Sequence, residues 1–138
     1  EIYHNPKNKF VSEFIGNINT FKTQILSASK DELSIDIDGL GSHKINNKFD
    51  VSQNDIIYSA IRPEEIIISK ENNLIKNKSY ECSIKNISFY GESTYFYVQP
   101  TNSDKIIMVS NYEEKFTFKE NDKCFINFDT KNIKIIKD

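Results

Sequence analysis

The spacing of apolar residues changes near residue 20, from a helical period to an alternating one. Upstream of that point, apolar side chains recur at i, i+1, i+4 and i+5, which places them on one face of a helix: Phe10, Val11, Phe14 and Ile15. Asn5 and Pro6 suit the start of such a helix, and Gly16 suits its end. We therefore predict a helix over residues 6–15, which is too short to be stable unless its apolar stripe docks on another surface.

Downstream of residue 20, apolar and polar residues alternate as in half-buried β-strands. Leu33, Ile35 and Ile37 alternate with polar neighbours, and Asp38-Gly39 is a typical hairpin turn. Similar short stretches follow at residues 45–51, 55–61, 66–69, 80–89, 94–99, 106–109, 124–128 and 133–136. Many short strands without long helices between them predict an all-β sandwich or small closed barrel, with one short N-terminal helix. Residues 74–79 are a candidate linker between two halves of the strand region.

Composition narrows the class of protein. The chain has 138 residues, of which 38% are hydrophobic and 28% charged, as in one folded domain. The formal net charge of −2 provides no general positive field for nucleic acid. No apolar run approaches the roughly 20 residues that cross a bilayer, and the N-terminus is too polar for a signal peptide, so we expect a cytoplasmic protein. Cys82 and Cys124 lack metal-ligand spacing and are predicted to be reduced core thiols.

No catalytic or metal-binding set is recognisable in the sequence. The four glycines, at positions 16, 39, 41 and 91, cannot form a phosphate-binding loop of the GxxxxGK[ST] type. His4 and His43 lie near turns without a neighbouring nucleophile, so we expect both to be surface residues. The adjacent carboxylates at 64–65 and 113–114 do not face each other on a helix or a strand. We predict a non-catalytic chain that holds no cofactor and no metal.

Two short segments are candidate interaction surfaces. Arg62-Pro63-Glu64 places a cation and an anion on either side of a rigid proline, which favours a local ion pair that braces a turn. The aromatic residues at 89–97 are of the kind that stack single-stranded bases in small barrels. Their charged neighbours are Glu92 and the single basic residue Lys85, so we expect these rings to pack between barrel halves or against a partner chain.

Three segments resemble the C-terminal part of ATP-binding subunits of ABC importers. Residues 1–19 are similar to a "Pro, spacer, Phe-Val-Ala-x-Phe-Ile-Gly" pattern, with Ser12 in the place of Ala. Residues 60–66 carry an Arg-Pro-Glu signature, and residues 89–94 resemble a Tyr-Leu-Gly element from which Phe89 and Tyr90 depart. Within this group, residues 17–19 and 107–112 look most like the spermidine and putrescine (polyamine) importers.

The resemblance implies an OB-like barrel of antiparallel strands, of the kind called TOBE, over residues 21–138. Residues 1–20 would be a connecting segment from the end of the ATPase core. ATP and Mg²⁺ would bind in a domain upstream of Glu1, so this chain would need neither and would not be an enzyme by itself. The longer protein would be a polyamine-transporting ATPase.

The resemblance also implies partners. The helix would dock on the nucleotide-binding domain of the same chain through Phe10, Val11, Phe14 and Ile15. A second copy of the subunit would pair with a surface that includes Arg62, Pro63, Glu64, Tyr90, Gly91 and Tyr95. Membrane permease subunits would hold the complex at the inner face of the cell membrane, and no nucleic acid would bind.

Two other functions remain open at this point. Related small barrels in molybdate transport hold oxyanions, so the chain is alternatively a binding barrel for an oxyanion or another small ligand. A single-stranded nucleic-acid-binding OB domain is a further alternative, which the acidic balance of the chain disfavours.

Overall fold

A computed structural model describes residues 18–49, 51–72, 79–113 and 116–137. The predicted helix over residues 6–15, with the docking residues Phe10, Val11, Phe14 and Ile15, lies outside this part of the chain. The described residues fall into two compact units. Unit 1 contains residues up to Ile61 and again from Thr130 onward, and unit 2 contains Arg62–Asp129.

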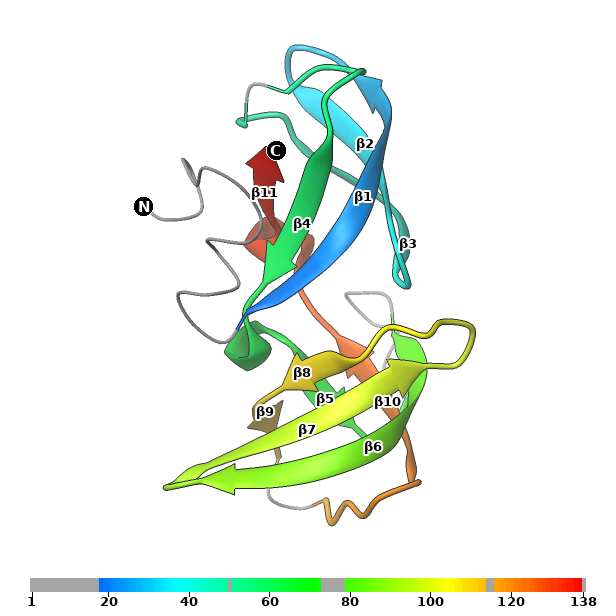
Figure 1. Ribbon diagram of the computed structural model, residues 1–138, viewed down its shortest axis with the longest axis vertical. Helices are drawn as coiled ribbons and strands as arrows, with labels where there is room; N and C mark the ends of the chain where they lie inside the picture. The colour runs from blue at the N-terminus through cyan, green and yellow to red at the C-terminus, as the bar shows by residue number, and fades with distance from the viewer. Residues whose placement is uncertain (1–17, 50, 73–78, 114–115, 138) are drawn as a thin grey trace. The chain divides into compact units, whose positions relative to one another are not determined.

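Unit 1 is built on a five-stranded sheet with the strand order β11-β4-β1-β2-β3 (Figure 1). All of its pairings are antiparallel. The strands are β1 (Asn19–Ala28), β2 (Glu32–Ile37), β3 (Gly41–Asn46), β4 (Ile57–Ile61) and β11 (Lys134–Lys137), and a short 3₁₀ turn, η2 (Thr130–Asn132), precedes β11. The predicted turn at Asp38-Gly39 joins β2 to β3, with Gly39 at φ 89° and Gly41 at φ 76°, conformations that glycine adopts without a Cβ penalty.

Unit 2 contains a six-stranded sheet with the order β8-β7-β6-β10-β5-β9. Its elements are η1 (Pro63–Glu65), β5 (Ile67–Ser69), β6 (Tyr80–Tyr90), β7 (Ser93–Pro100), β8 (Ile107–Val109), β9 (Asn111–Tyr112) and β10 (Lys123–Asn127). The β5–β9 pair is parallel, and the other pairs are antiparallel. Most of the alternating residues that face inward are aliphatic, and several are fully buried, among them Ile84, Val98, Ile107 and Ile126.

The all-β class predicted from the alternating pattern is confirmed. The arrangement of the strands differs from the single OB-like barrel, because each sheet ends in two edge strands and no closed barrel is present among the described residues. The predicted division at residues 74–79 stays a prediction; β5 and β6 flank that segment, and both pair with β10. Alternation reports which side of a strand is buried but not which strand lies beside it, so the arrangement of the strands did not follow from the pattern.

Two strand boundaries also differ from the prediction. The third strand occupies Gly41–Asn46 instead of residues 45–51, because the turn at Asp38-Gly39 is tight and pairing with β2 begins directly after it. β1 begins at Asn19, inside the segment 1–20 that was predicted to be a connection. These shifts are local and leave the order of elements along the chain unchanged.

Part of the β6–β7 hairpin extends beyond its neighbours (Figure 1). β10 pairs only with Tyr80–Ser83 of β6, and β8 pairs only with Phe96–Val98 of β7. Residues 88–95, which we call the β6–β7 arm, are therefore paired with each other alone. Gly91 has φ 59° at the first central position of the two-residue turn between Tyr90 and Ser93, a position at which type II′ hairpins favour glycine.

Candidate functional site

The Arg62-Pro63-Glu64 signature forms a compact turn at η1. The Arg62 backbone N–H donates to Glu65 Oε1 at 3.0 Å, and the Glu65 N–H donates to the Arg62 carbonyl at 3.0 Å. Pro63 is buried, and its carbonyl accepts from the Ile66 N–H at 3.2 Å. Reciprocal bonds of this kind satisfy the exposed donors at the start of a helical turn.

The predicted ion pair within this signature is present. Arg62 Nη1 lies 3.9 Å from Glu64 Oε2, with side-chain exposures of 43% and 61%. An exposed pair at this distance contributes at most about 1 kcal/mol. The turn is therefore held mainly by the Glu65 carboxylate, by its backbone bonds and by Pro63, and the side chains of Arg62 and Glu64 are largely exposed.

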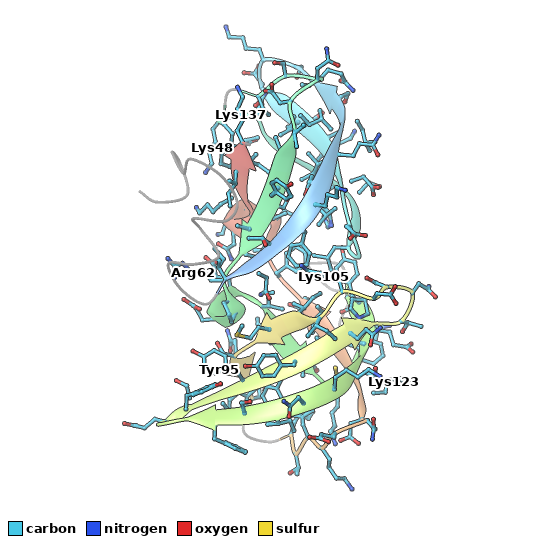
Figure 2. The ribbon with its side chains drawn as sticks, in the orientation of Figure 1. Lys48, Arg62, Tyr95, Lys105, Lys123 and Lys137 are labelled. Atoms are coloured by element: carbon cyan, nitrogen blue, oxygen red, sulfur yellow. The ribbon has the colours of Figure 1, made fainter. Side chains whose placement is uncertain are left out.

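The β6–β7 arm carries a group of exposed aromatic rings. Phe89 is 76% exposed and Tyr90 is 60% exposed. Tyr95 is labelled in Figure 2, and its ring meets the Tyr90 ring edge to face with centroids 5.5 Å apart. In the hairpin register, Phe89 lies opposite Thr94. Phe89 therefore shares a face with buried Phe96, which follows Thr94 by two residues on β7. Tyr90 and Tyr95 share the other face.

β9 connects these two segments within unit 2. The Asn111 side-chain amide donates to the Glu64 carbonyl at 3.3 Å, and the Tyr112 hydroxyl donates to Thr94 Oγ1 at 3.4 Å. The Ser110 N–H, just before β9, donates to the Pro63 carbonyl at 3.0 Å. The structure therefore joins the signature turn to the arm through a two-residue strand that the sequence pattern did not predict, because two residues are too short to show alternation.

The two cysteines lie opposite each other on paired strands. Cys82 of β6 and Cys124 of β10 are register partners, and both are buried free thiols. Burial raises the pKa of Cys124 to about 12, with a smaller contribution from Asp122. Burial also raises the pKa of Cys82, with smaller contributions from Cys124 and Glu81. Burial therefore disfavours the thiolate form that a cysteine nucleophile requires near neutral pH.

Thiol reactivity tests this environment. We expect neither cysteine to react with a disulfide reagent such as DTNB in the folded chain at pH 8, because both raised pKa values lie far above that pH. Both should react at once in guanidinium chloride, where burial is lost. Rapid stoichiometric labelling of the folded chain would show that the β6–β10 pair is open to solvent.

Of the two histidines considered in the sequence analysis, the structure describes His43. His43 is 8% exposed and its Nε2 lies 3.0 Å from the Leu40 carbonyl, so the prediction of a surface histidine is wrong at this position. His4 lies outside the described residues. Among the residues that the structure describes, no group of three or more His, Cys, Asp or Glu side chains could hold a metal ion. No helix in this part of the chain is long and apolar enough to cross a membrane.

Among the described residues of unit 1, two surface hollows have linings of opposite charge. The larger, of about 610 Å³, is lined by Asp36, Asp38 and Asp55, with Lys22 as its cation. Asp55 is already engaged, since its Oδ2 accepts from the Ser52 N–H at 2.8 Å and lies 3.3 Å from Lys137 Nζ. The smaller hollow, of about 190 Å³, is lined by three lysines and one glutamate.

Comparison with known proteins gives distant sequence relatives. No protein-family model matches the chain. The spermidine/putrescine import ATP-binding protein PotA of Protochlamydia amoebophila is 29% identical over 124 residues, which is 87% of this chain and 32% of that protein. PotA of Fusobacterium nucleatum is 28% identical over 134 residues, which is 94% of this chain and 35% of that protein. The chain is a distant relative of the C-terminal part of these ATP-binding subunits.

The relationship confirms the resemblance inferred from the three sequence segments. The chain spans about a third of the length of these relatives, and the catalytic domain is not within it. Among solved structures, the cytoplasmic molybdate-binding protein ModG with molybdate bound aligns with a TM-score of 0.66. The alignment covers 85% of this chain and 94% of that chain at 10% identity, so it shows a shared TOBE-like fold.

Proposed function

We propose that this chain is the non-catalytic C-terminal regulatory and dimerisation domain of an ABC importer's ATP-binding subunit, and that the importer carries a polyamine such as spermidine or putrescine. The observation that supports this proposal is the similarity over most of the chain to the C-terminal part of proteins named as spermidine/putrescine import ATP-binding subunits. The absence of a phosphate-binding loop from the sequence fits a domain that leaves ATP hydrolysis to another part of the protein.

In this proposal, residues 1–20 connect the strand-rich region to a nucleotide-binding domain that holds ATP and Mg²⁺. Phe10, Val11, Phe14 and Ile15 would pack against that domain, which gives a short amphipathic helix the docking surface that it needs. The permease subunits of the importer would place the complex at the inner face of the cell membrane.

Two copies of the subunit would pair through unit 2. The pairing surface would combine Arg62, Pro63 and Glu64 with Tyr90 and Tyr95 of the arm, two segments that β9 joins. Gly91 would contribute through its turn conformation. Phe89, which is 76% exposed and lies in the aromatic segment 89–97, would belong to this surface as well. Such pairing would keep two ATPase cores at high effective concentration between cycles of ATP hydrolysis.

A chimera tests the proposed function. The C-terminal part of Fusobacterium nucleatum PotA is replaced by this chain and expressed in cells that lack their own subunit. We expect the chimera to restore uptake of labelled spermidine, whereas PotA truncated before the same region serves as the control. A chimera that is made in normal amount and hydrolyses ATP, yet supports no uptake, would contradict the assignment.

A ligand-binding barrel is a second candidate, and the fold shared with molybdate-bound ModG favours it. Calorimetric titration of the chain with molybdate separates the two functions. Molybdate binding without any effect of the chimera on spermidine uptake would favour the second candidate.

A further inference from the structure

The β6 strand of the β6–β7 arm has an open backbone edge. β10 pairs with β6 only over Tyr80–Ser83, so among the described residues no strand lies beside residues 86–90 of β6 (Figure 1). The β7 side of the arm is different, because the Tyr112 hydroxyl of β9 donates to Thr94 Oγ1 there at 3.4 Å. We call residues 86–90 of β6 the arm edge.

The hairpin register shows which backbone groups face outward at the arm edge. Residues on either side of a two-residue turn form a hydrogen-bonded pair, and bonded and non-bonded pairs then alternate along the hairpin. Tyr90 and Ser93 occupy those flanking positions. The N–H and C=O groups of Ile87 and Phe89 therefore point away from β7. The Ile87 N–H agrees with this direction, because it donates to Asn86 Oδ1 at 2.8 Å.

The composition of the arm does not protect this edge. Edge strands in proteins are commonly guarded against further pairing by lysine, by proline or by inward-pointing charges. Residues 86–95 contain no lysine and no proline, and Glu92 is their one charged residue. Phe89 adds an apolar ring that is 76% exposed. The arm edge therefore has the properties of a strand to which another strand can add.

A second copy of the same arm complements this edge in charge. Lys85 and Glu92 are both exposed and lie at opposite ends of it. Two copies related by a two-fold axis and paired antiparallel place Lys85 of one copy beside Glu92 of the other at both ends. A parallel pair would instead set the two Glu92 carboxylates side by side, which is destabilising. The charge pattern therefore favours antiparallel addition of the chain to itself.

We propose that two copies of this chain join edge to edge through the β6 strands of their arms, antiparallel, with Ser88 opposite Ser88 of the second copy. In this register Ile87 of each copy lies opposite Phe89 of the other, so their outward backbone groups exchange hydrogen bonds and each Phe89 ring covers an Ile87 side chain. The inference rests on the proposed pairing of two copies through unit 2, to which it adds the strand, its direction and its register.

Sedimentation equilibrium of the 138-residue chain, from about 1 µM to about 1 mM, tests the proposal by a charge swap. Lys85→Glu and Glu92→Lys should each raise the dimer dissociation constant about tenfold, because each sets like charges together at both ends of the paired edges. The double variant Lys85→Glu/Glu92→Lys should restore the constant to within about threefold of the parent chain. Lys30→Glu, an exposed lysine between β1 and β2, changes the net charge as Lys85→Glu does and should alter the constant by no more than about twofold.

Cross-linking tests the register. Directly opposite residues of a non-hydrogen-bonded pair lie close enough for a disulfide, so Ser88→Cys treated with the oxidant diamide should give a covalent dimer. Ser93→Cys, on β7 of the same hairpin, is the matched control and should remain uncross-linked, and both native cysteines are buried. Circular dichroism spectra that match the parent chain show that the variants fold.

The outcomes separate this inference from the proposed function. A dimer that the charge variants leave unchanged, or that cross-links through Ser93→Cys and not through Ser88→Cys, would overturn pairing through the arm edge and leave pairing through another surface of unit 2 intact. A chain that stays monomeric over the whole concentration range would overturn both. The spermidine uptake of the chimera decides the importer function independently of either result.

Discussion

Replacing Phe96 with alanine is expected to lower the free energy of unfolding by about 3–5 kcal/mol. Phe96 is 4% exposed and lies opposite Ile87 on β6 and Val109 on β8. Its ring meets Tyr112 at 5.3 Å and Phe118 at 5.1 Å between centroids, both edge to face. The substitution removes the apolar contact area, two favourable ring contacts and the side chain that fills the space between them.

Urea denaturation followed by far-UV circular dichroism measures this loss, and Phe89→Ala is its matched control. Phe89 is a phenylalanine of the same hairpin on the same face, but it is 76% exposed, so its substitution should change stability by no more than about 0.5 kcal/mol. Hydrogen exchange in Phe96→Ala should accelerate most in the six-stranded sheet. Equal destabilisation by the two variants would mean that the arm is not the exposed extension described above.

Replacing Leu33 with alanine is expected to destabilise the chain by about 2–5 kcal/mol. Leu33 is 0% exposed in the middle of the other sheet, opposite Ala28 on β1 and Ile45 on β3. Both strand neighbours are held by backbone pairing, so the space left by the side chain closes only in part, and the cost of a cavity adds to the lost burial.

Leu26→Ala is the matched control for this substitution. Leu26 lies on neighbouring β1 and is 48% exposed, so alanine there should cost at most about 1 kcal/mol, mostly through strand propensity. The same urea titration compares the two variants. If Leu26→Ala proves as costly as Leu33→Ala, then the outer side of β1 is covered in solution.

The candidate site was predictable only where its residues are neighbours in sequence. The Arg62–Glu64 ion pair and the turn at Gly91 follow from three or four consecutive residues, and the structure contains both. The link between them did not follow, because β9 reaches Glu64 and Thr94 through side chains of Asn111 and Tyr112. Those contacts join positions separated by 47 and 18 residues, and no local pattern encodes them.

The burial of individual side chains was likewise predictable where the local pattern decides it and not where strand pairing does. Alternation correctly identified Leu33, Ile35 and Ile37 as inward-facing residues. It misplaced His43, whose position two residues before Ile45 puts it on the inward side of β3 once the register with β2 is known. The prediction treated that histidine as part of a turn because the boundary of the strand was set four residues too late.

By itself, the sequence determined that the chain is all-β, where most of its strands and its glycine-dependent turns lie, and which family it resembles. These properties are local, because the period of burial and the backbone conformation depend on residues a few positions apart. The tertiary structure alone decided that the strands form two sheets, that β11 returns to β4, that Cys82 faces Cys124, and that Lys131 joins Lys44 and Lys48. Strand pairing depends on contacts between distant segments, and alternating patterns that are alike in every strand do not specify which two strands meet.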